Sequence, residues 1–238
     1  IKVLDALKKN YLASKTDLII NCDGKKNKHD NNVNEVEKIC KSIAGFKSVR
    51  IIKNKKNIGL SNSIIKNVTK EIKKSKKIII LEDDIVTSKS FLNYMNSALD
   101  FYKNKKSVWH ISGHTLFEIY PNKPNDIYFS SYMNCWGWGT WENRWANFNK
   151  NSKMVLKELD KNQKIKKKFQ IHKLSGFYEQ VLGNFNKEID TWAIFWYWQI
   201  FKEKKFCVNP NKTLTKNIGQ DGTGTHKDYN INIESLNE

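Results

Sequence analysis

Three acidic residues directly follow a short apolar run in the first half of the chain. The run Ile78-Ile79-Ile80-Leu81 leads into Glu82, Asp83 and Asp84. Such a β-branched run is typical of a strand buried on both faces, and open α/β sheets bind ligands beyond the carboxyl ends of their strands. Adjacent carboxylates repel one another and lose hydration there, so we expect a divalent cation to neutralise them. The alternative is an acidic turn that stabilises the N-terminus of the next helix.

A cation among carboxylates is suited to the chemistry of phosphorylated molecules. Mg²⁺ and Mn²⁺ bind a protein carboxylate together with phosphate oxygens, and they neutralise a diphosphate as its bond to the rest of the molecule breaks. The sequence therefore predicts a metal-dependent enzyme that acts on a phosphorylated substrate.

Two polar motifs nearer the N-terminus are candidates for contacts with a nucleotide. Asp23 follows a predicted strand, where its carboxylate could accept a hydrogen bond from a nucleobase or a ribose; an ordinary Asp-Gly turn is the alternative. The motif Asn57-Ile58-Gly59-Leu60-Ser61-Asn62 precedes a predicted helix. Gly59 would let the backbone approach a ligand, and the helix N-terminus near Asn62 would attract a phosphate or ribose, although a plain helix start explains the motif as well.

Tryptophan and glycine alternate from position 136, and seven of the eight tryptophans fall between positions 136 and 198. Indole rings stack on the apolar faces of sugars or bases, and glycine allows close packing beside them. We expect Trp136, Gly137 and Trp138 to line a pocket, with Trp141 and Trp145 in the core. The alternative is core packing on a helix, because Trp138, Trp141 and Trp145 recur at helical spacing.

Two further candidates lie in the C-terminal part of the chain. Asp190 opens an apolar helix, and a carboxylate beside apolar surface has a raised pKa, which suits a general base; a helix N-cap is the alternative. The tail from Asn217 is rich in glycine and could close over a diphosphate, with His226 as a second metal ligand or a phosphate contact.

The composition limits the classes of partner and compartment. A net charge of +18 favours nucleotide phosphates, acidic glycans or an anionic membrane face, unless it is only a lysine-rich solvated surface. The densest run, Lys164 to Lys168, is the candidate for a peripheral contact with the inner face of a membrane. Four cysteines without metal-binding spacing predict reduced thiols, and we recognise neither a signal peptide nor a membrane span, so we expect a cytoplasmic protein.

The elements that position these residues alternate between helix and strand. The patterns predict helices over residues 1–13, 32–43, 60–72 and 88–102, and strands over residues 17–22, 49–52, 78–81 and 108–112. This alternation predicts a parallel sheet with crossover helices. Further along, the patterns predict a strand at 127–129, helices within 152–185 and at 190–201, and a strand at 206–208. We expect one domain, with a nucleotide-binding half (1–113) and an acceptor-binding half (114–238).

The ordered set of motifs resembles the GT-A fold glycosyltransferases, and within them the bacterial relatives of N-acetylglucosaminyltransferase I. The resemblance covers nearly the whole chain. Besides the acidic triplet it is carried by Asn134-Cys135-Trp136-Gly137-Trp138-Gly139-Thr140-Trp141, Asp190-Thr191-Trp192, Asn217-Ile218-Gly219 and Gly224-Thr225-His226.

The resemblance implies an α/β fold of GT-A type, which is a Rossmann-like, mixed but mostly parallel sheet flanked by helices. It also implies a nucleoside diphosphate sugar donor, such as a UDP-sugar, and Mn²⁺ or Mg²⁺. By this resemblance Asp84 binds the metal, while Glu82 and Asp83 face the ribose and sugar of the donor. Asp190 matches the base that deprotonates the acceptor hydroxyl with inversion at the anomeric carbon, and Asp23 touches the nucleobase.

The resemblance has one gap. The family has a strand and a nucleotide-contacting loop before the helix predicted at 1–13, and the printed sequence starts at that helix. We therefore expect the sheet formed by these residues to lack that strand.

The expected function is transfer of a sugar from a nucleotide sugar to a glycan or lipid-linked acceptor, in surface polysaccharide or glycoconjugate biosynthesis. One alternative is a sugar nucleotidyltransferase, which also places acids at strand ends but releases pyrophosphate. The other is a non-enzymatic, basic module that binds nucleic acid or glycan, which the charge and tryptophans favour but the acidic triplet does not. We expect no nucleic-acid partner.

Overall fold

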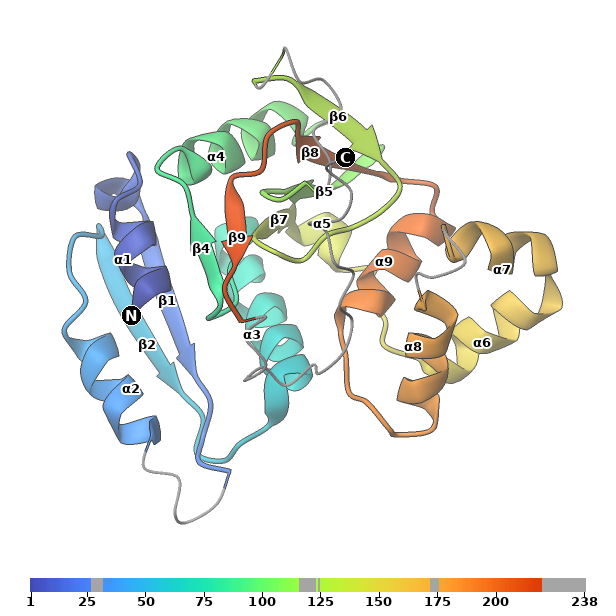
Figure 1. The fold of residues 1–238 in the computed structure, drawn as a ribbon, viewed down its shortest axis with the longest axis horizontal. Helices are drawn as coiled ribbons and strands as arrows, with labels where there is room; N and C mark the ends of the chain where they lie inside the picture. Colours follow the sequence, from blue (N-terminus) through green and yellow to red (C-terminus); the bar gives the residue numbers. More distant parts are fainter. Residues whose placement is uncertain (27–31, 116–122, 124, 172–175, 220–238) are drawn as a thin grey trace, which may run out of the picture.

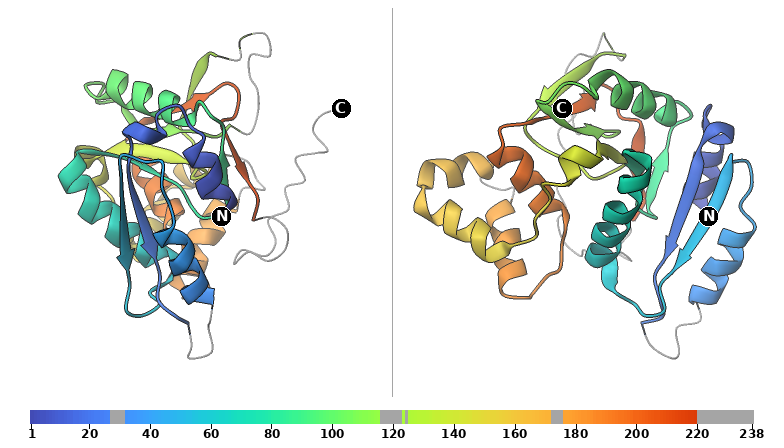
Figure 2. Two further views of the ribbon diagram at one scale, coloured as in Figure 1. Left: turned by 90° about the vertical axis from the view of Figure 1, so that its left-hand side faces the viewer. Right: turned by 180° about the vertical axis from the view of Figure 1, so that it is seen from behind.

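The computed structural model describes residues 1–26, 32–115, 123, 125–171 and 176–219, and it shows a mixed α/β fold. The α/β class predicted from the sequence is therefore confirmed. Figure 1 and the rear view in Figure 2 agree on the arrangement: strands β1 and β2 lie at one end, a five-stranded sheet lies in the middle, and helices α6 to α9 lie at the other end.

The first half follows the predicted alternation closely. Its elements are α1 (Lys2–Lys8), a 3-10 turn (Ala13–Lys15), β1 (Asp17–Cys22), α2 (Asn32–Lys41), β2 (Ser48–Lys53), α3 (Gly59–Ser75), β3 (Lys77–Ile80), β4 (Ile85–Thr87), α4 (Phe91–Tyr102) and β5 (Val108–Ser112). The first helix is shorter than predicted, and the short strand β4 had no pattern of its own. Strands β1 and β2 pair in parallel, with Leu18 opposite Val49, as a β-α-β unit requires.

The described part of the second half contains four strands and a group of helices. Its elements are β6 (Ile127–Ser130), β7 (Trp138–Trp141), α5 (Glu142–Trp145), α6 (Ser152–Lys161), α7 (Gln163–Phe169), α8 (Phe177–Phe185), α9 (Ala193–Lys202), β8 (Phe206–Pro210) and β9 (Thr215–Asn217). Strands from both predicted halves share one sheet, because its order is β3-β7-β5-β8-β6.

The expectation of a mostly parallel sheet is wrong for the described strands. In the central sheet only β5 and β8 pair in parallel; β3 with β7, β5 with β7 and β6 with β8 are antiparallel, as is the separate pair β4 and β9. Two of these antiparallel pairings are made by strand β7, which enters between β3 and β5 with Trp138 opposite Ile80. The helical interpretation of Trp138 and Trp141 is wrong for the same reason.

Burial of strand β3 is also less complete than its apolar sequence predicts. Ile80 is buried, whereas Ile78 and Ile79 are half-buried. The strand lies at one edge of the five-stranded sheet, so part of its surface is not covered by a neighbouring strand.

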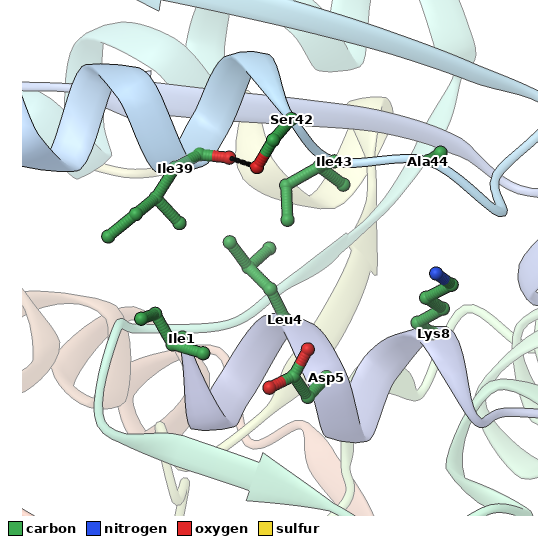
Figure 3. Close-up of a pocket in the computed structure, with 8 residues that line it drawn as sticks. All are labelled: Ile1, Leu4, Asp5, Lys8, Ile39, Ser42, Ile43 and Ala44. Atoms are coloured by element: carbon green, nitrogen blue, oxygen red, sulfur yellow. Dashed lines mark hydrogen bonds between the residues drawn. The ribbon is translucent and has the colours of Figure 1, made fainter.

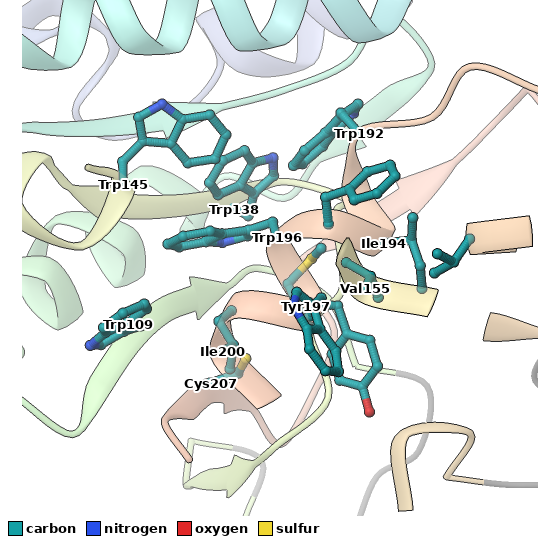
Figure 4. Packing of buried hydrophobic residues seen from close by; sticks show 14 of the residues in the cluster. Trp109, Trp138, Trp145, Val155, Trp192, Ile194, Trp196, Tyr197, Ile200 and Cys207 are labelled. Carbon is teal, nitrogen blue, oxygen red and sulfur yellow. The ribbon is translucent and has the colours of Figure 1, made fainter. Parts of the chain in front are cut away.

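Two apolar cores pack against the central sheet. Trp138 and Trp141 are three residues apart on one strand, so their side chains point to opposite faces. Trp138 belongs to a core of stacked rings with Trp145, Trp192 and Trp196, shown in Figure 4. On the other face Trp141 joins a core built mainly by α4, which contributes Phe91, Leu92, Met95 and Leu99.

Helix α9 is buried along most of its length, which agrees with its apolar sequence. Every residue from Ile194 to Ile200 is buried, including Trp196 and Trp198. Within the described ranges, no helix has both the length and the apolar character that crossing a bilayer requires.

Candidate active site

The acidic triplet forms the turn between β3 and β4. Asp83 is exposed, while Glu82 and Asp84 are half-buried. The next helix, α4, begins only at Phe91, after strand β4. The triplet therefore leads into a strand and not into a helix N-terminus, and the structure does not support the helix-stabilising alternative.

The surroundings of Glu82 disfavour the ionised form of its carboxyl group. Burial, followed by the negative charges of Asp84 and Asp83, raises the pKa of Glu82 to about 7, and a hydrogen bond from the Trp192 side chain acts in the opposite direction. The Trp192 ring is itself stacked on Trp138, with 5.0 Å between ring centroids. A cation beside this group would favour the carboxylate, because opposite charge stabilises the ionised form.

Asp84 lies against the start of the glycine-rich tail. Strand β4 pairs with β9, with Ile85 opposite Asn217, and the backbone N–H of Ile218 donates to the Asp84 carbonyl at 2.9 Å. A Cβ atom on Gly219 would lie 2.6 Å from Asp84 Oδ2, so the carboxylate occupies space that only glycine leaves open. The structure thus brings together two motifs that are more than 130 residues apart in the sequence.

The turn before strand β7 packs beside the same two segments. Gly137 has a φ angle of +80°, and a Cβ there would lie 2.9 Å from Thr215 Cγ2 and 3.2 Å from Leu81 Cδ2. The Thr215 hydroxyl donates to the carbonyl of Trp136 at 2.8 Å. The ring of Trp136 is half-buried and contacts His114, with 4.6 Å between ring centroids.

Trp138 does not share the exposure of Trp136. It is 0% exposed and packs in the ring core with Trp145. Trp138 is therefore a core residue, as was expected of Trp141 and Trp145. A pocket-lining role for its side chain is not supported, because the residue alternation of β7 points that side chain into the sheet core.

Asp23 holds the beginning of helix α3. Its carboxylate accepts hydrogen bonds from the backbone N–H groups of Ile58 at 3.1 Å, Gly59 at 2.9 Å and Gly24 at 2.9 Å. These bonds satisfy donors that a helix N-terminus leaves open. The Asp23 carboxylate therefore serves the start of α3, and its acceptors are used by its own chain; residues 23–25 form no regular turn.

Gly59 and Asn62 lie at the first turn of α3. Gly59 has a φ angle of +78°, and a Cβ there would meet nothing within 4 Å. The exposed Asn62 side chain donates to the carbonyl of Ile58 at 3.0 Å. The backbone of Gly59 is thus accessible, as a ligand-binding helix start requires, although its N–H already donates to Asp23.

Asp190 lies in a different environment from the one expected. Its side chain is 55% exposed and forms an ion pair with Lys150, whose ammonium group also donates to Ser61 Oγ at 2.7 Å. Helix α9 begins at Ala193 with Trp192 at its N-cap, so the N-cap alternative for Asp190 is wrong. The sequence argument for a general base assumed that Asp190 lies beside apolar surface. In the structure Asp190 is instead exposed and has a cationic partner.

The predicted residues converge on one region through contacts that the sequence did not reveal. Lys150 links Asp190 to the first turn of α3, and Trp192 links the same loop to Glu82. Trp192 stands within a motif of the resemblance, but Lys150 and Thr215 had no local signal. His226 lies outside the described residues.

Oxygen donors are available for a hard cation at the triplet. Within the described part of the chain, no group of three or more His, Cys, Asp or Glu side chains has the geometry of a metal site. Mg²⁺ and Mn²⁺ are nevertheless bound through one or two carboxylates plus substrate phosphates. The half-buried Asp84 beside Gly219 fits such a cation, with its carboxylate as the donor.

Two surface hollows lie away from the triplet. One, of about 230 Å³, separates α1 from α2 and is shown in Figure 3; its lining includes Leu4, Ile39 and Ile43. The other, of about 490 Å³, lies between α1 and β4 and includes Val86 and Lys89. Neither hollow is lined by a residue predicted to act in the site.

Comparison with models of protein families and with curated protein sequences finds no match to this chain. The functional assignment therefore depends on the residues and their geometry.

Proposed function

We propose that the protein is a metal-dependent glycosyltransferase of GT-A type. It transfers a sugar from a nucleoside diphosphate sugar, such as a UDP-sugar, to a hydroxyl group of a glycan or lipid-linked acceptor, with inversion. The observation that supports this proposal best is the convergence of the Glu82–Asp84 turn with Gly219, with the Trp136–Gly137 turn and with the loop that carries Asp190 and Trp192. The mixed α/β fold agrees with a GT-A transferase only at the level of the α/β class.

The chemistry assigns a role to each side of this region. Asp84 would hold Mn²⁺ or Mg²⁺, which would supply positive charge to the departing diphosphate, while Glu82 and Asp83 would face the ribose and sugar of the donor. Asp190 takes the proton of the acceptor hydroxyl, whose oxygen bonds to the anomeric carbon as the bond from that carbon to the diphosphate oxygen breaks. Lys150 orients the Asp190 carboxylate through their ion pair.

Substitution of Asp84 tests the proposal directly. Asp84→Asn should lower metal-dependent turnover by about a hundredfold or more, because several kcal/mol of charge stabilisation depend on the cation. Asp126→Asn is a matched control, since Asp126 pairs with Lys123 outside the site. Normal turnover in Asp84→Asn would contradict the metal assignment.

Product analysis separates the transferase from the nucleotidyltransferase alternative. The proposed reaction releases a nucleoside diphosphate, whereas a nucleotidyltransferase releases pyrophosphate. A thermal-shift screen of nucleotides and nucleotide sugars, with and without Mn²⁺, identifies the donor, because a ligand of the native state raises its melting temperature.

The binding-module alternative loses support from the position of the tryptophans. Seven of the eight are at most 7% exposed, and Trp136 alone is half-buried. Stacking on nucleic-acid bases needs exposed ring faces, which these residues do not offer. Salt-dependent retention of RNA without any metal-dependent nucleotide binding would restore this alternative.

A further inference from the structure

Six exposed lysines lie on the outer sides of two consecutive helices, α6 and α7. Helix α6 buries Val155, Leu156 and Leu159, and helix α7 buries Phe169. The lysines recur at helical spacing opposite these residues, and all six are exposed. We call them the lysine face: Lys153, Lys157, Lys161, Lys164, Lys167 and Lys168.

The acidic residues of these helices are occupied by other partners. Glu158 pairs with Lys202, and Asp160 pairs with Lys166 and accepts a hydrogen bond from Tyr178. Within the described part of the chain, none of the six lysines of this face forms an ion pair. Their charge is therefore not compensated by neighbouring side chains.

Exposed apolar side chains accompany the lysines on α7. Ile165 is 39% exposed, and Ile171, just beyond the end of the helix, is 53% exposed. Ile171 also has a φ angle of +52°, a conformation that is unfavourable for a β-branched residue. An exposed isoleucine contributes little to the core, so this combination of lysine and isoleucine is not explained by folding.

The neighbouring isoleucines favour a lipid surface over a nucleic acid. A nucleic-acid surface combines basic residues with exposed aromatic rings, whereas the rings on α7 and at the start of α8 are not exposed: Phe169 is buried, and Phe177 and Tyr178 are half-buried. A membrane surface combines basic residues with aliphatic side chains that enter the boundary between headgroups and acyl chains. The lysine face with Ile165 and Ile171 has the second composition.

We propose that the lysine face, together with Ile165 and Ile171, docks the protein on a bilayer that contains anionic lipids. The net charge of +18 attracts the protein to such a surface, and the lysine face determines which side touches it. This docking does not depend on the proposed transferase activity. It would also place the chain where a lipid-linked acceptor is found.

Vesicle co-sedimentation tests the proposal with the intact chain. The protein should bind vesicles of phosphatidylcholine with about 30% phosphatidylglycerol and should not bind pure phosphatidylcholine, and raising NaCl from about 0.05 to about 0.5 M should release it. Each lysine near an anionic surface contributes about fivefold in affinity. Neutralising three of them should therefore weaken binding roughly a hundredfold, which is tested by the α7 variant: Lys164→Gln, Lys167→Gln and Lys168→Gln.

A control variant with the same loss of charge makes the test specific. It neutralises three exposed lysines elsewhere: Lys9→Gln, Lys73→Gln and Lys106→Gln. The control should bind anionic vesicles nearly as well as the wild type, and both variants should melt at the wild-type temperature. Equal losses in the two variants would show that net charge alone causes binding and would overturn the proposal.

Two further results would also contradict the proposal. One is equal binding to neutral and anionic vesicles. The other is unchanged vesicle binding by the α7 variant together with loss of its RNA retention, which would assign the face to a nucleic acid.

Discussion

At the level of single residues, the buried His110 shows how the core fixes one protonation state. Its Nε2–H donates to the carbonyl of Asn134 at 3.0 Å, and its Nδ1 accepts from the Trp196 indole at 3.3 Å. Burial lowers the pKa of His110 to about 3. A second proton on Nδ1 would face the indole N–H, so the ring stays neutral in the folded protein.

This neutral histidine predicts a pH-dependent stability. In the unfolded chain His110 takes up a proton below about pH 6.5, while in the folded protein it does not until about pH 3. The contribution of neutral His110 to the free energy of unfolding is therefore complete above pH 6.5. It is lost as the pH falls towards 3, by about 1.4 kcal/mol per pH unit. Glu82, whose pKa is raised to about 7, acts with the opposite sign, because it favours the folded state at low pH.

A comparison with His110→Gln isolates the histidine, because Glu82 contributes equally to both proteins. Gln keeps a donor for Asn134 but cannot be protonated. The difference in unfolding free energy, wild type minus variant, should shrink by about 1.4 kcal/mol for each pH unit below 6.5. Urea unfolding at a series of pH values measures it; a difference independent of pH would contradict the neutral, buried state.

Gly219 offers a test of the site that leaves the carboxylates intact. An alanine there places its Cβ 2.6 Å from Asp84 Oδ2 and 3.0 Å from Asp84 Cβ, so the Asp84 side chain must move. Gly219→Ala should weaken Mn²⁺ binding at least about tenfold, since donor geometry determines the affinity for such ions. Gly45→Ala is the control, because its Cβ would meet the Lys8 side chain at 2.8 Å, in the loop between α2 and β2 and outside the site. Unchanged Mn²⁺ affinity, measured by titration, would show that Asp84 does not bind the metal.

At the level of elements, the sequence predicts those that a single local pattern defines. The strands at 78–81 and 108–112 and the helices α2, α3 and α4 were found close to their predicted bounds, whereas α1 ends well before residue 13. Strand β7 was not predicted, because Trp138, Trp141 and Trp145 fit helical spacing. This segment forms a strand because it pairs with β3 and β5. Strands β4 and β9 have three residues each and exist because they pair across the chain.

The same limit applies to the candidate site. The acidic triplet stands out locally, because apolar residues precede it. The contact of Asp84 with Gly219, the hydrogen bond of Trp192 with Glu82 and the pairing of Lys150 with Asp190 join segments that no local pattern connects. The residue types of the site could therefore be predicted, but its shape and its positioning residues could not.

The end of helix α7 predicts a stabilising substitution. Ile171 adopts a φ angle of +52° and is 53% exposed, so it is strained without filling the core. Ile171→Gly should relieve that strain and stabilise the protein by about 0.5–1 kcal/mol, which is about 1–4 °C in melting temperature for a domain of this size. The same variant should bind anionic vesicles less well. A lower melting temperature would show that the isoleucine side chain is needed for folding.

At the level of the whole molecule, the central sheet and the β1–β2 pair are not equally secured. The central sheet has five strands and a core on each face, whereas β1 and β2 form a pair of their own. An isolated two-stranded sheet is of marginal stability, and proteins open first where few buried contacts hold an element. The end that contains β1, β2 and α2 should therefore open before the central sheet does.

The cysteines report on this order of unfolding. All four are free thiols; Cys22 and Cys40 lie in the β1–α2 unit with their sulfurs 3.7 Å apart, and Cys207 lies in the central sheet with no exposed surface. Burial and the Cys40 contact raise the pKa of Cys22 to about 11, and burial also raises that of Cys207, so both resist alkylation in the folded state. In a urea series with iodoacetamide labelling and peptide mass spectrometry, Cys22 and Cys40 should become reactive at lower urea than Cys207. Coincident midpoints would instead show that both sheets unfold as one cooperative unit.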